Sequence, residues 1–497
     1  MEPTADRSGA ASAAVAWTAV AWTAAGALLL LLALVIVRLP WAGDLGMHAA
    51  TIERLRHSLT APGNPLVDAD TPSPYYSPWT VLLGAFAKVT GLGTFTVLRI
   101  AAAVGLILLV TGVWRFVRTL SAHRAAPAVA VLCVLLLWGT ERFDWSGFPG
   151  LGSLALTVAY PSTFALGLAF HLWAGLRGAL RTAASWWVFL GLGLLWAVVL
   201  LSHQFSGVVA TIGVLAMLAG ARPWPGEAVW LRLAAGLALG VALLNEWPYY
   251  FFFRLLTTGG GLDAIHQSLY RQLLPHVGLA LLGVVALALR WRRDRRDPLV
   301  IFFAIGAVVF AAGGVTGHYA WGRVLPAALI PAQVAAAVEV FEARGVAVRR
   351  AFGGVLCGAL AVGMFSQSGT LGYVVPLRAL PSVVAEKYRA PWVGYRWVVP
   401  WVRYGDVVMA QTFPARQIPA YGGYTVAPGY PDVFLADEGV RGRDRDLYYS
   451  PSASDAERGR VLREYGVRWV VGGPVWGGVR AVATGPQGLV LYEVVRG

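Results

Sequence analysis

Apolar residues in the first three quarters of the chain form long uninterrupted stretches, separated by short polar segments. A helix of roughly 20 apolar residues crosses a hydrocarbon core of about 30 Å. The pattern therefore predicts a mainly α-helical, polytopic membrane protein with about eleven transmembrane helices. We expect the spans at residues 16–37, 96–116, 126–139, 153–175, 185–201, 207–220, 233–253, 276–289, 299–315, 324–340 and 351–375.

The hydrophobic pattern changes after the last span. Residues 1–376 are expected to form a transmembrane domain with a long first outer loop at residues 40–95, and residues 377–497 a small α/β domain. In that second part the pattern predicts helical structure at 383–404 and 455–465, and strands at 406–410, 468–471 and 489–495. Cys133 and Cys357 both fall inside predicted spans, so the C-terminal domain contains no cysteine for a disulfide.

The distribution of charged residues predicts how the chain is oriented in the membrane. Charged residues make up only 13% of the chain, yet its formal net charge is +14, and with the N-terminus inside most interhelical arginines fall on the cytoplasmic side. We therefore expect a multi-pass plasma membrane protein with a cytoplasmic N-terminus and an extracytoplasmic C-terminal domain. The basic clusters beside the spans favour contact with membrane lipids, and they lack the reading elements of a nucleic-acid-binding surface.

The outer side collects the polar residues that could carry chemistry. Gly43, Asp44 and His48 follow the first span directly. If a helix starts there, Asp44 and His48 lie on one face, and the carboxylate could take a proton from an attacking hydroxyl. The alternative is that Asp44 caps a surface helix that runs to about residue 59.

Further binding candidates lie in the same outer loop and in three later outer turns. Asp68, Asp70, Tyr75 and Tyr76 could bind a sugar, although aromatic belts at a membrane surface produce similar residues. The turn with His203 and Gln204 would be costly in lipid and should line protein or water. The other candidates are Glu246 at the end of a span, and His318, Tyr319 and Arg323, where the Arg323 guanidinium suits a phosphate oxygen or reaches to headgroups.

These features together resemble the GT-C superfamily of membrane glycosyltransferases, and in particular its actinobacterial members. The resemblance lies in Gly43-Asp44 and His48 after the first span, in Asn64-Pro65 and Tyr75 to Pro78, and in the segments 145–148, 160–163, 203–207, 418–423 and 463–472. It implies a GT-C fold, with Asp44 as the general base. It also implies a polyprenyl-phosphate sugar donor, of the arabinofuranosyl or mannosyl type, and a cell-envelope glycan or glycolipid acceptor.

Other functions stay open on the sequence alone. A secondary transporter or flippase of lipid-linked sugars, or a non-catalytic scaffold that binds cell-wall glycan, would also be a polytopic protein with an exported domain. Motifs for nucleoside triphosphates, zinc proteases, CxxC redox chemistry and serine hydrolases do not occur. No cofactor is required by the pattern, and a divalent metal ion is left open because Asp44 and His48 alone make a weak site.

Overall fold

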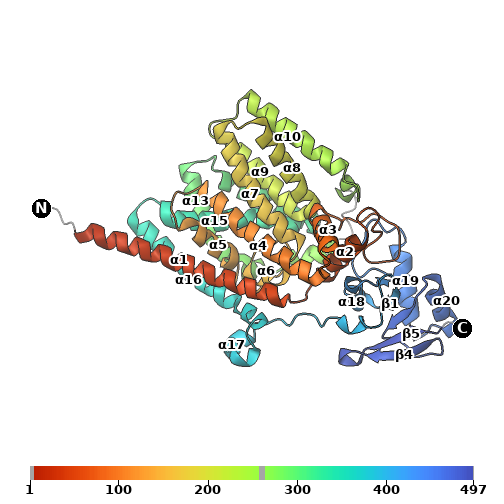
Figure 1. The fold of residues 1–497 in the computed structure, drawn as a ribbon. Helices are drawn as coiled ribbons and strands as arrows, with labels where there is room; N and C mark the ends of the chain where they lie inside the picture. The colour runs from red at the N-terminus through yellow and green to blue at the C-terminus, as the bar shows by residue number, and fades with distance from the viewer. Residues whose placement is uncertain (1–4, 257–262, 496–497) are drawn as a thin grey trace. The chain divides into compact units, whose positions relative to one another are not determined.

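The computed structural model describes residues 5–256 and 263–495 of the chain. The fold is mainly helical, with a single five-stranded sheet among these residues (Figure 1). The described chain forms two compact units. Among the described residues, unit 1 comprises 5–40, 102–246 and 263–390, and unit 2 comprises 41–101, 247–256 and 391–495.

Unit 1 consists of helices. Its longer helices are α1 (Ala5–Arg38), most of α4 (Thr94–Arg118), α5 (Ala126–Leu136), α6 (Leu151–Thr157), α7 (Pro161–Thr182), α8 (Trp186–Ser202), α9 (Gln204–Ala219), α10 (Glu227–Asn245), α13 (Leu281–Arg293), α14 (Pro298–Thr316), α15 (Pro326–Glu342) and α16 (Val346–Ser366). Short turns join them: α11 (Asp263–His266), η3 (Gln267–Tyr270), α12 (Leu273–Val277), η4 (Gly278–Ala280), η5 (Tyr319–Val324), η6 (Ser368–Tyr373), η7 (Leu377–Ala379) and α17 (Ser382–Ala385).

Seven helical segments of the described chain are long and apolar enough to cross a membrane, so the chain is a membrane protein. They are Thr18–Arg38, Thr94–Arg118, Glu227–Asn245, Leu273–Arg293, Pro298–Thr316, Tyr319–Glu342 and Val346–Ser366. This number is lower than the eleven predicted from the sequence. Three of the remaining predictions fall on the shorter apolar helices α5, α8 and α9. The fourth, at 153–175, is divided before Pro161 into α6 and α7, and α7 carries His171, Arg177 and Arg181.

Close packing and a buried charge network hold unit 1 together. A Cβ atom on Gly193 of α8 would overlap the backbone of Gly236 in α10, so these two helices approach closely at glycine. Arg290 donates to Asp297 at 3.0 Å and to Glu339 at 3.3 Å, and all three residues are buried. Partnered in this way, the buried charges avoid the large cost of an isolated ion.

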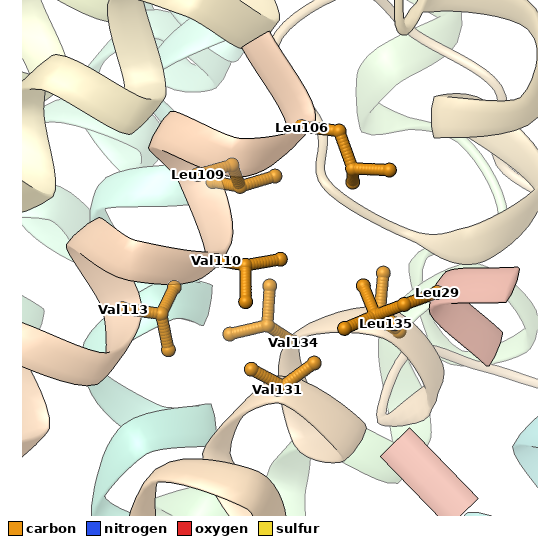
Figure 2. A pocket seen from close by; sticks show the side chains of 8 residues that line it. All are labelled: Leu29, Leu106, Leu109, Val110, Val113, Val131, Val134 and Leu135. Carbon is orange, nitrogen blue, oxygen red and sulfur yellow. The ribbon is translucent and has the colours of Figure 1, made fainter. Parts of the chain in front are cut away.

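An apolar pocket lies among α1, α4 and α5 of unit 1 (Figure 2). Its lining consists of aliphatic side chains only, from Leu29, Leu106, Leu109, Val110, Val113, Val131, Val134 and Leu135. Its volume is about 10 Å³, so it is a small gap in the packing of apolar side chains and not a substrate site.

Unit 2 is built around the sheet. Its strands are β1 (Val407–Ala410), β2 (Tyr424–Thr425), β3 (Trp469–Val471), β4 (Val479–Thr484) and β5 (Val490–Val494), in the order β2-β1-β3-β5-β4. β1 pairs in parallel with β2 and β3, whereas β5 is antiparallel to β3 and β4. Alternation along β1 sends Val408 and Ala410 to one core, and Val407 and Met409 to the other.

Helices complete unit 2: α2 (Leu45–His57), α3 (Pro78–Thr90), η1 (Phe252–Leu256), η8 (Arg396–Val398), α18 (Thr412–Ala415), η9 (Ile418–Tyr421), α19 (Glu438–Tyr449) and α20 (Asp455–Glu464). The predicted helix at 455–465 and the three predicted strands are present. The helical structure predicted at 383–404 is present only as two short pieces, α17 and η8, because Pro391, Gly394 and Pro400 interrupt the stretch. Strands β2 and β4 and helix α19 were not predicted.

Helix α2 is held against the C-terminal part of unit 2 by Arg54. This guanidinium is fully buried, donates to the carbonyl of Gly422 at 2.8 Å and also to that of Gly423, and lies 3.6 Å from the ring centroid of Tyr424. His57 stacks on Tyr404, with ring centroids 3.6 Å apart. Residues 41–101 and the C-terminal residues therefore fold together in unit 2.

Candidate functional site

Asp44 stands at the N-terminus of α2, where the chain turns sharply. Gly43 before it has a positive φ of 47°, and the carbonyl of Asp44 accepts the amide of His48 at 3.1 Å. The Asp44 side chain is partly exposed, and among the described residues it makes no capping hydrogen bond to α2. Eleven of the thirteen residues of α2 are buried, so the surface helix of the capping alternative is not what the structure contains.

Two phenols lie within electrostatic reach of the Asp44 carboxylate. The Tyr430 hydroxyl donates to the carbonyl of Gly43 at 2.7 Å, and the Tyr75 hydroxyl donates to that of Pro431 at 3.2 Å. Burial raises the pKa of both tyrosines, and the negative charge of Asp44 raises it further. Both phenols therefore stay protonated at neutral pH and remain hydrogen-bond donors beside a carboxylate.

Two further carboxylates lie around Tyr75. Asp432 is buried, accepts from the Asn64 amide at 2.7 Å and from the backbone N–H of Phe434 at 3.0 Å, and its pKa is raised by burial. Glu438 accepts the backbone N–H of Asp432 at 3.1 Å. These bonds give Asp432 and Glu438 a structural role in shaping the loop, and Asp44 is more exposed than the buried Asp432.

His48 lies one turn further along α2 and is 9% exposed. Burial lowers its pKa to about 3, so the imidazole is neutral at physiological pH. A neutral imidazole can donate or accept a hydrogen bond but supplies no positive charge to a phosphate.

The other candidates between residues 40 and 95 lie in different surroundings within unit 2. Tyr76 is buried, and its hydroxyl donates to the carbonyl of Gly63 at 2.8 Å, which is a structural contact. Asp68 and Asp70 are exposed. Asp68 lines a polar cleft at the sheet of unit 2, together with residues that the sequence did not single out.

Arg323 forms a second cluster, in unit 1. It is 6% exposed and donates to the carbonyl of Ser146 at 2.7 Å. The guanidinium lies 4.7 Å from the ring centroid of Phe205 and 5.3 Å from that of Trp145. Arg323 is thus enclosed among aromatic rings of unit 1 and does not extend outward as the headgroup alternative requires.

His203 belongs to the same cluster. It ends α8 and begins α9, and its Nδ1 accepts the backbone N–H of Ser206 at 3.1 Å. The proton is thereby assigned to Nε2, which lies 3.5 Å from the Ser146 hydroxyl. Gly147, with a φ of 82°, passes so close that a Cβ atom would lie 3.4 Å from the His203 ring.

The remaining predicted residues lie at other places in unit 1. Gln204 is the first residue of α9. Glu246 is exposed at the end of α10 and accepts from the Asn245 amide at 2.7 Å. His318 is exposed and stacks on Trp321, whereas Tyr319 packs edge-on against Tyr270.

Sequence reasoning missed several members of both clusters. In unit 1, buried His266 lies between Trp145 and Phe205, at centroid distances of 5.4 and 5.5 Å. In unit 2, Tyr430 and Asp432 come from a segment that carried no predicted chemistry. The resemblance at 145–148 indicated Trp145, one of the rings around His266, and no signal pointed to Tyr430 or Asp432.

The described residues do not fit a bound metal ion. Among them, no group of three or more His, Cys, Asp or Glu side chains is placed to hold one. Asp44 and His48 together offer at most two ligands.

Comparisons with known proteins identify the fold. No protein-family model and no curated protein sequence matches the chain. Among solved structures, arabinofuranosyltransferase AftD from Mycobacteria matches with a TM-score of 0.59 in a mutant form and 0.55 in another structure, at 16% and 15% identity. These matches cover 97% of this chain but only 42% and 40% of the AftD chains.

A third match spans nearly the whole of both chains. ArnT from Cupriavidus metallidurans, in the apo state, has a TM-score of 0.53 and 15% identity, covering 97% of this chain and 98% of that one. Identities this low show the fold alone. The neighbours are GT-C glycosyltransferases, so the GT-C fold expected from the sequence is confirmed.

Proposed function

We propose that the chain is a membrane glycosyltransferase acting at the outer face of the plasma membrane. Its donor is a polyprenyl-phosphate sugar, and its acceptor is a cell-envelope glycan or glycolipid. The observation that carries the proposal is Asp44, a partly exposed carboxylate at the start of α2 beside two protonated phenols, in a chain with the GT-C fold. One of the matched structures is an arabinofuranosyltransferase, which favours arabinofuranose as the donor sugar.

The reaction needs a base for the acceptor. Asp44 takes the proton of the acceptor hydroxyl while the hydroxyl oxygen bonds to the anomeric carbon of the donor sugar. The bond from that carbon to the phosphate oxygen breaks, and polyprenyl phosphate leaves with the electron pair. General-base assistance of this kind contributes about 10² to 10⁴ in rate. The Tyr75 and Tyr430 hydroxyls each donate their proton to a backbone carbonyl, so they can orient the acceptor by accepting a hydrogen bond at their oxygen atoms.

The donor phosphate needs a cation and a hydrogen-bond donor. Unit 1 contains groups of this chemistry in the guanidinium of Arg323 and the Nε2–H of His203, and we propose them as phosphate-binding residues independently of Asp44. Apolar helices provide hydrocarbon contact for the polyprenyl chain. Lipid-linked donors are also the physically reasonable source, because nucleotide sugars are not supplied outside the membrane.

The test replaces the proposed base. Asp44→Asn keeps the size of the side chain and removes its basicity, so we expect sugar transfer to fall by about 10² to 10⁴ while thermal stability is retained. Asp446→Asn, an exposed carboxylate on α19, is the matched control. The measurement is release of polyprenyl phosphate by the purified chain from a panel of polyprenyl-phosphate sugars.

Two results would contradict this proposal. Near-normal turnover by Asp44→Asn would show that Asp44 is not the base. Absence of polyprenyl phosphate release by the natural chain across the panel, together with movement of the lipid-linked sugar between leaflets, would favour a transporter or flippase.

A further inference from the structure

A polar cleft of about 700 Å³ opens at one end of the unit 2 sheet, where β1, β3 and β4 begin and β5 ends. Its polar lining comes from separate parts of the chain: Asp68, Asp406, Tyr465, Arg468, Arg480 and Glu493. A volume of this size lies within the range of about 300 to 1,000 Å³ that is usual for sites of small ligands. The cleft is distinct from the surroundings of Asp44.

Both arginines that line the cleft are paired with carboxylates of the same cleft. Arg468 pairs with Asp406 at 3.2 Å, and Arg480 pairs with its cross-strand neighbour Glu493 at 2.6 Å. Asp68 adds a third carboxylate. Among the described residues that line the cleft, acids therefore outnumber bases, which disfavours a phosphate or another anion.

The pairing also fixes the side chains. Asp406 accepts the indole N–H of Trp469 at 2.9 Å, and the Tyr465 hydroxyl donates to Asp444 at 2.7 Å. Asp406 is thus held by Arg468 and Trp469, whereas Arg480 is largely exposed, and the ring of Tyr465 forms part of the lining. Planar polar groups of this kind form paired hydrogen bonds with neighbouring hydroxyls, and an aromatic face packs on the apolar face of a sugar ring.

We propose that this cleft binds a neutral oligosaccharide segment. Asp68 comes from the loop between α2 and α3, which also carries Tyr75 beside Asp44. This connection within unit 2 favours the acceptor glycan, and in naming the acceptor the inference rests on the proposed function. Saccharide binding itself requires no transfer, so the two proposals fail separately.

The test measures binding without any donor. The full chain, in detergent, is titrated with neutral hexasaccharides of arabinose and of mannose, and affinity is determined by calorimetry. We expect saturable binding of at least one of them. Asp68→Asn and Glu493→Gln should each weaken it about tenfold, because each removes charge from a hydrogen-bond acceptor. Asp446→Asn, outside the cleft, should leave the affinity unchanged.

The outcomes separate the possibilities. Absence of saturable binding by either hexasaccharide overturns the proposal, as does binding that the Asp68 and Glu493 variants do not change. Displacement of the sugar by millimolar inorganic phosphate would identify an anion site and also overturn it. If the cleft variants lose binding while the natural chain shows no transfer from any donor, the cleft stands and the glycosyltransferase proposal fails.

Discussion

At the scale of single residues, Gly46 shows how closely the start of α2 is packed. A Cβ atom at this position would overlap the backbone carbonyl of Arg416. We expect Gly46→Ala to lower the free energy of unfolding of unit 2 by about 1 to 3 kcal/mol, because backbone must shift to make room. Thermal unfolding in detergent measures the effect.

The matched control is Gly93→Ala, since nothing lies within 4 Å of a Cβ atom there. Equal melting temperatures for the two variants would contradict the packing of α2 described above. Because Asp44 lies two residues before Gly46, Gly46→Ala should also reduce any activity that depends on Asp44.

Because His48 is buried, we expect the stability of the folded chain to depend on pH. Its pKa is about 3 in the folded chain and about 6.5 in an unfolded one. Between these values only the unfolded state binds the proton, so the free energy of unfolding should fall as the pH falls, by about 1.4 kcal/mol per pH unit. Above pH 6.5 His48 is neutral in both the folded and the unfolded chain, so its effect on the free energy of unfolding no longer changes with pH.

Comparison with His48→Gln isolates this contribution, because glutamine cannot take up the proton. Melting temperatures between pH 4 and 7 should decline less steeply in the variant than in the natural chain. Parallel curves would show that His48 is not buried in the neutral form.

At the scale of elements, His203 joins α8 to α9 and can be tested as a cap and as a chemical group. Loss of an N-cap side chain costs about 0.5 to 2 kcal/mol, whereas asparagine is a good N-cap. We therefore expect His203→Ala to lower the melting temperature and His203→Asn to restore it. If His203 also contacts the donor phosphate, transfer stays low in both variants.

Recovery of transfer along with stability in His203→Asn would leave only the capping role. The comparison uses the same release of polyprenyl phosphate, together with KM for the donor, which a purely structural effect on α9 would not raise selectively.

The elements also show how far the sequence could be interpreted. Long apolar stretches such as residues 16–37 and 299–315 were placed well, because length and composition alone identify a spanning helix. Pairing within the sheet was out of reach, since β2 has two residues and its partner β1 lies in another stretch of chain. Local spacing identified Asp44, because His48 lies only four residues away. Tyr430 and Asp432 were missed, because they lie nearly 390 positions further along the chain and only the fold brings them near Asp44.

At the scale of the whole molecule, the orientation in the membrane can be measured. The charge bias predicts that the loop with Arg344 is cytoplasmic and that α19 is outside. In a chain with Cys133→Ala and Cys357→Ala, we expect a membrane-impermeant thiol reagent to label Asp446→Cys in intact cells. It should label Arg344→Cys only after permeabilisation.

Both positions are exposed in the structure, so the reagent can reach either side chain once it is on the correct side. Labelling of Arg344→Cys in intact cells would reverse the orientation and place the proposed site inside, where nucleotide sugars are available. The lipid-linked donor would then lose its physical argument.

The Arg54 contact has a consequence for the history of this sequence. Its guanidinium is held by carbonyls 368 and 369 positions further along the chain, at Gly422 and Gly423. A change at position 54 leaves two buried carbonyls without this donor, and a Cβ atom at 423 would lie 3.0 Å from Val402 and shift the carbonyl to which Arg54 donates. Distant homologues should therefore vary these positions together, and a gene shortened before residue 422 would leave the helix behind Asp44 without its anchor.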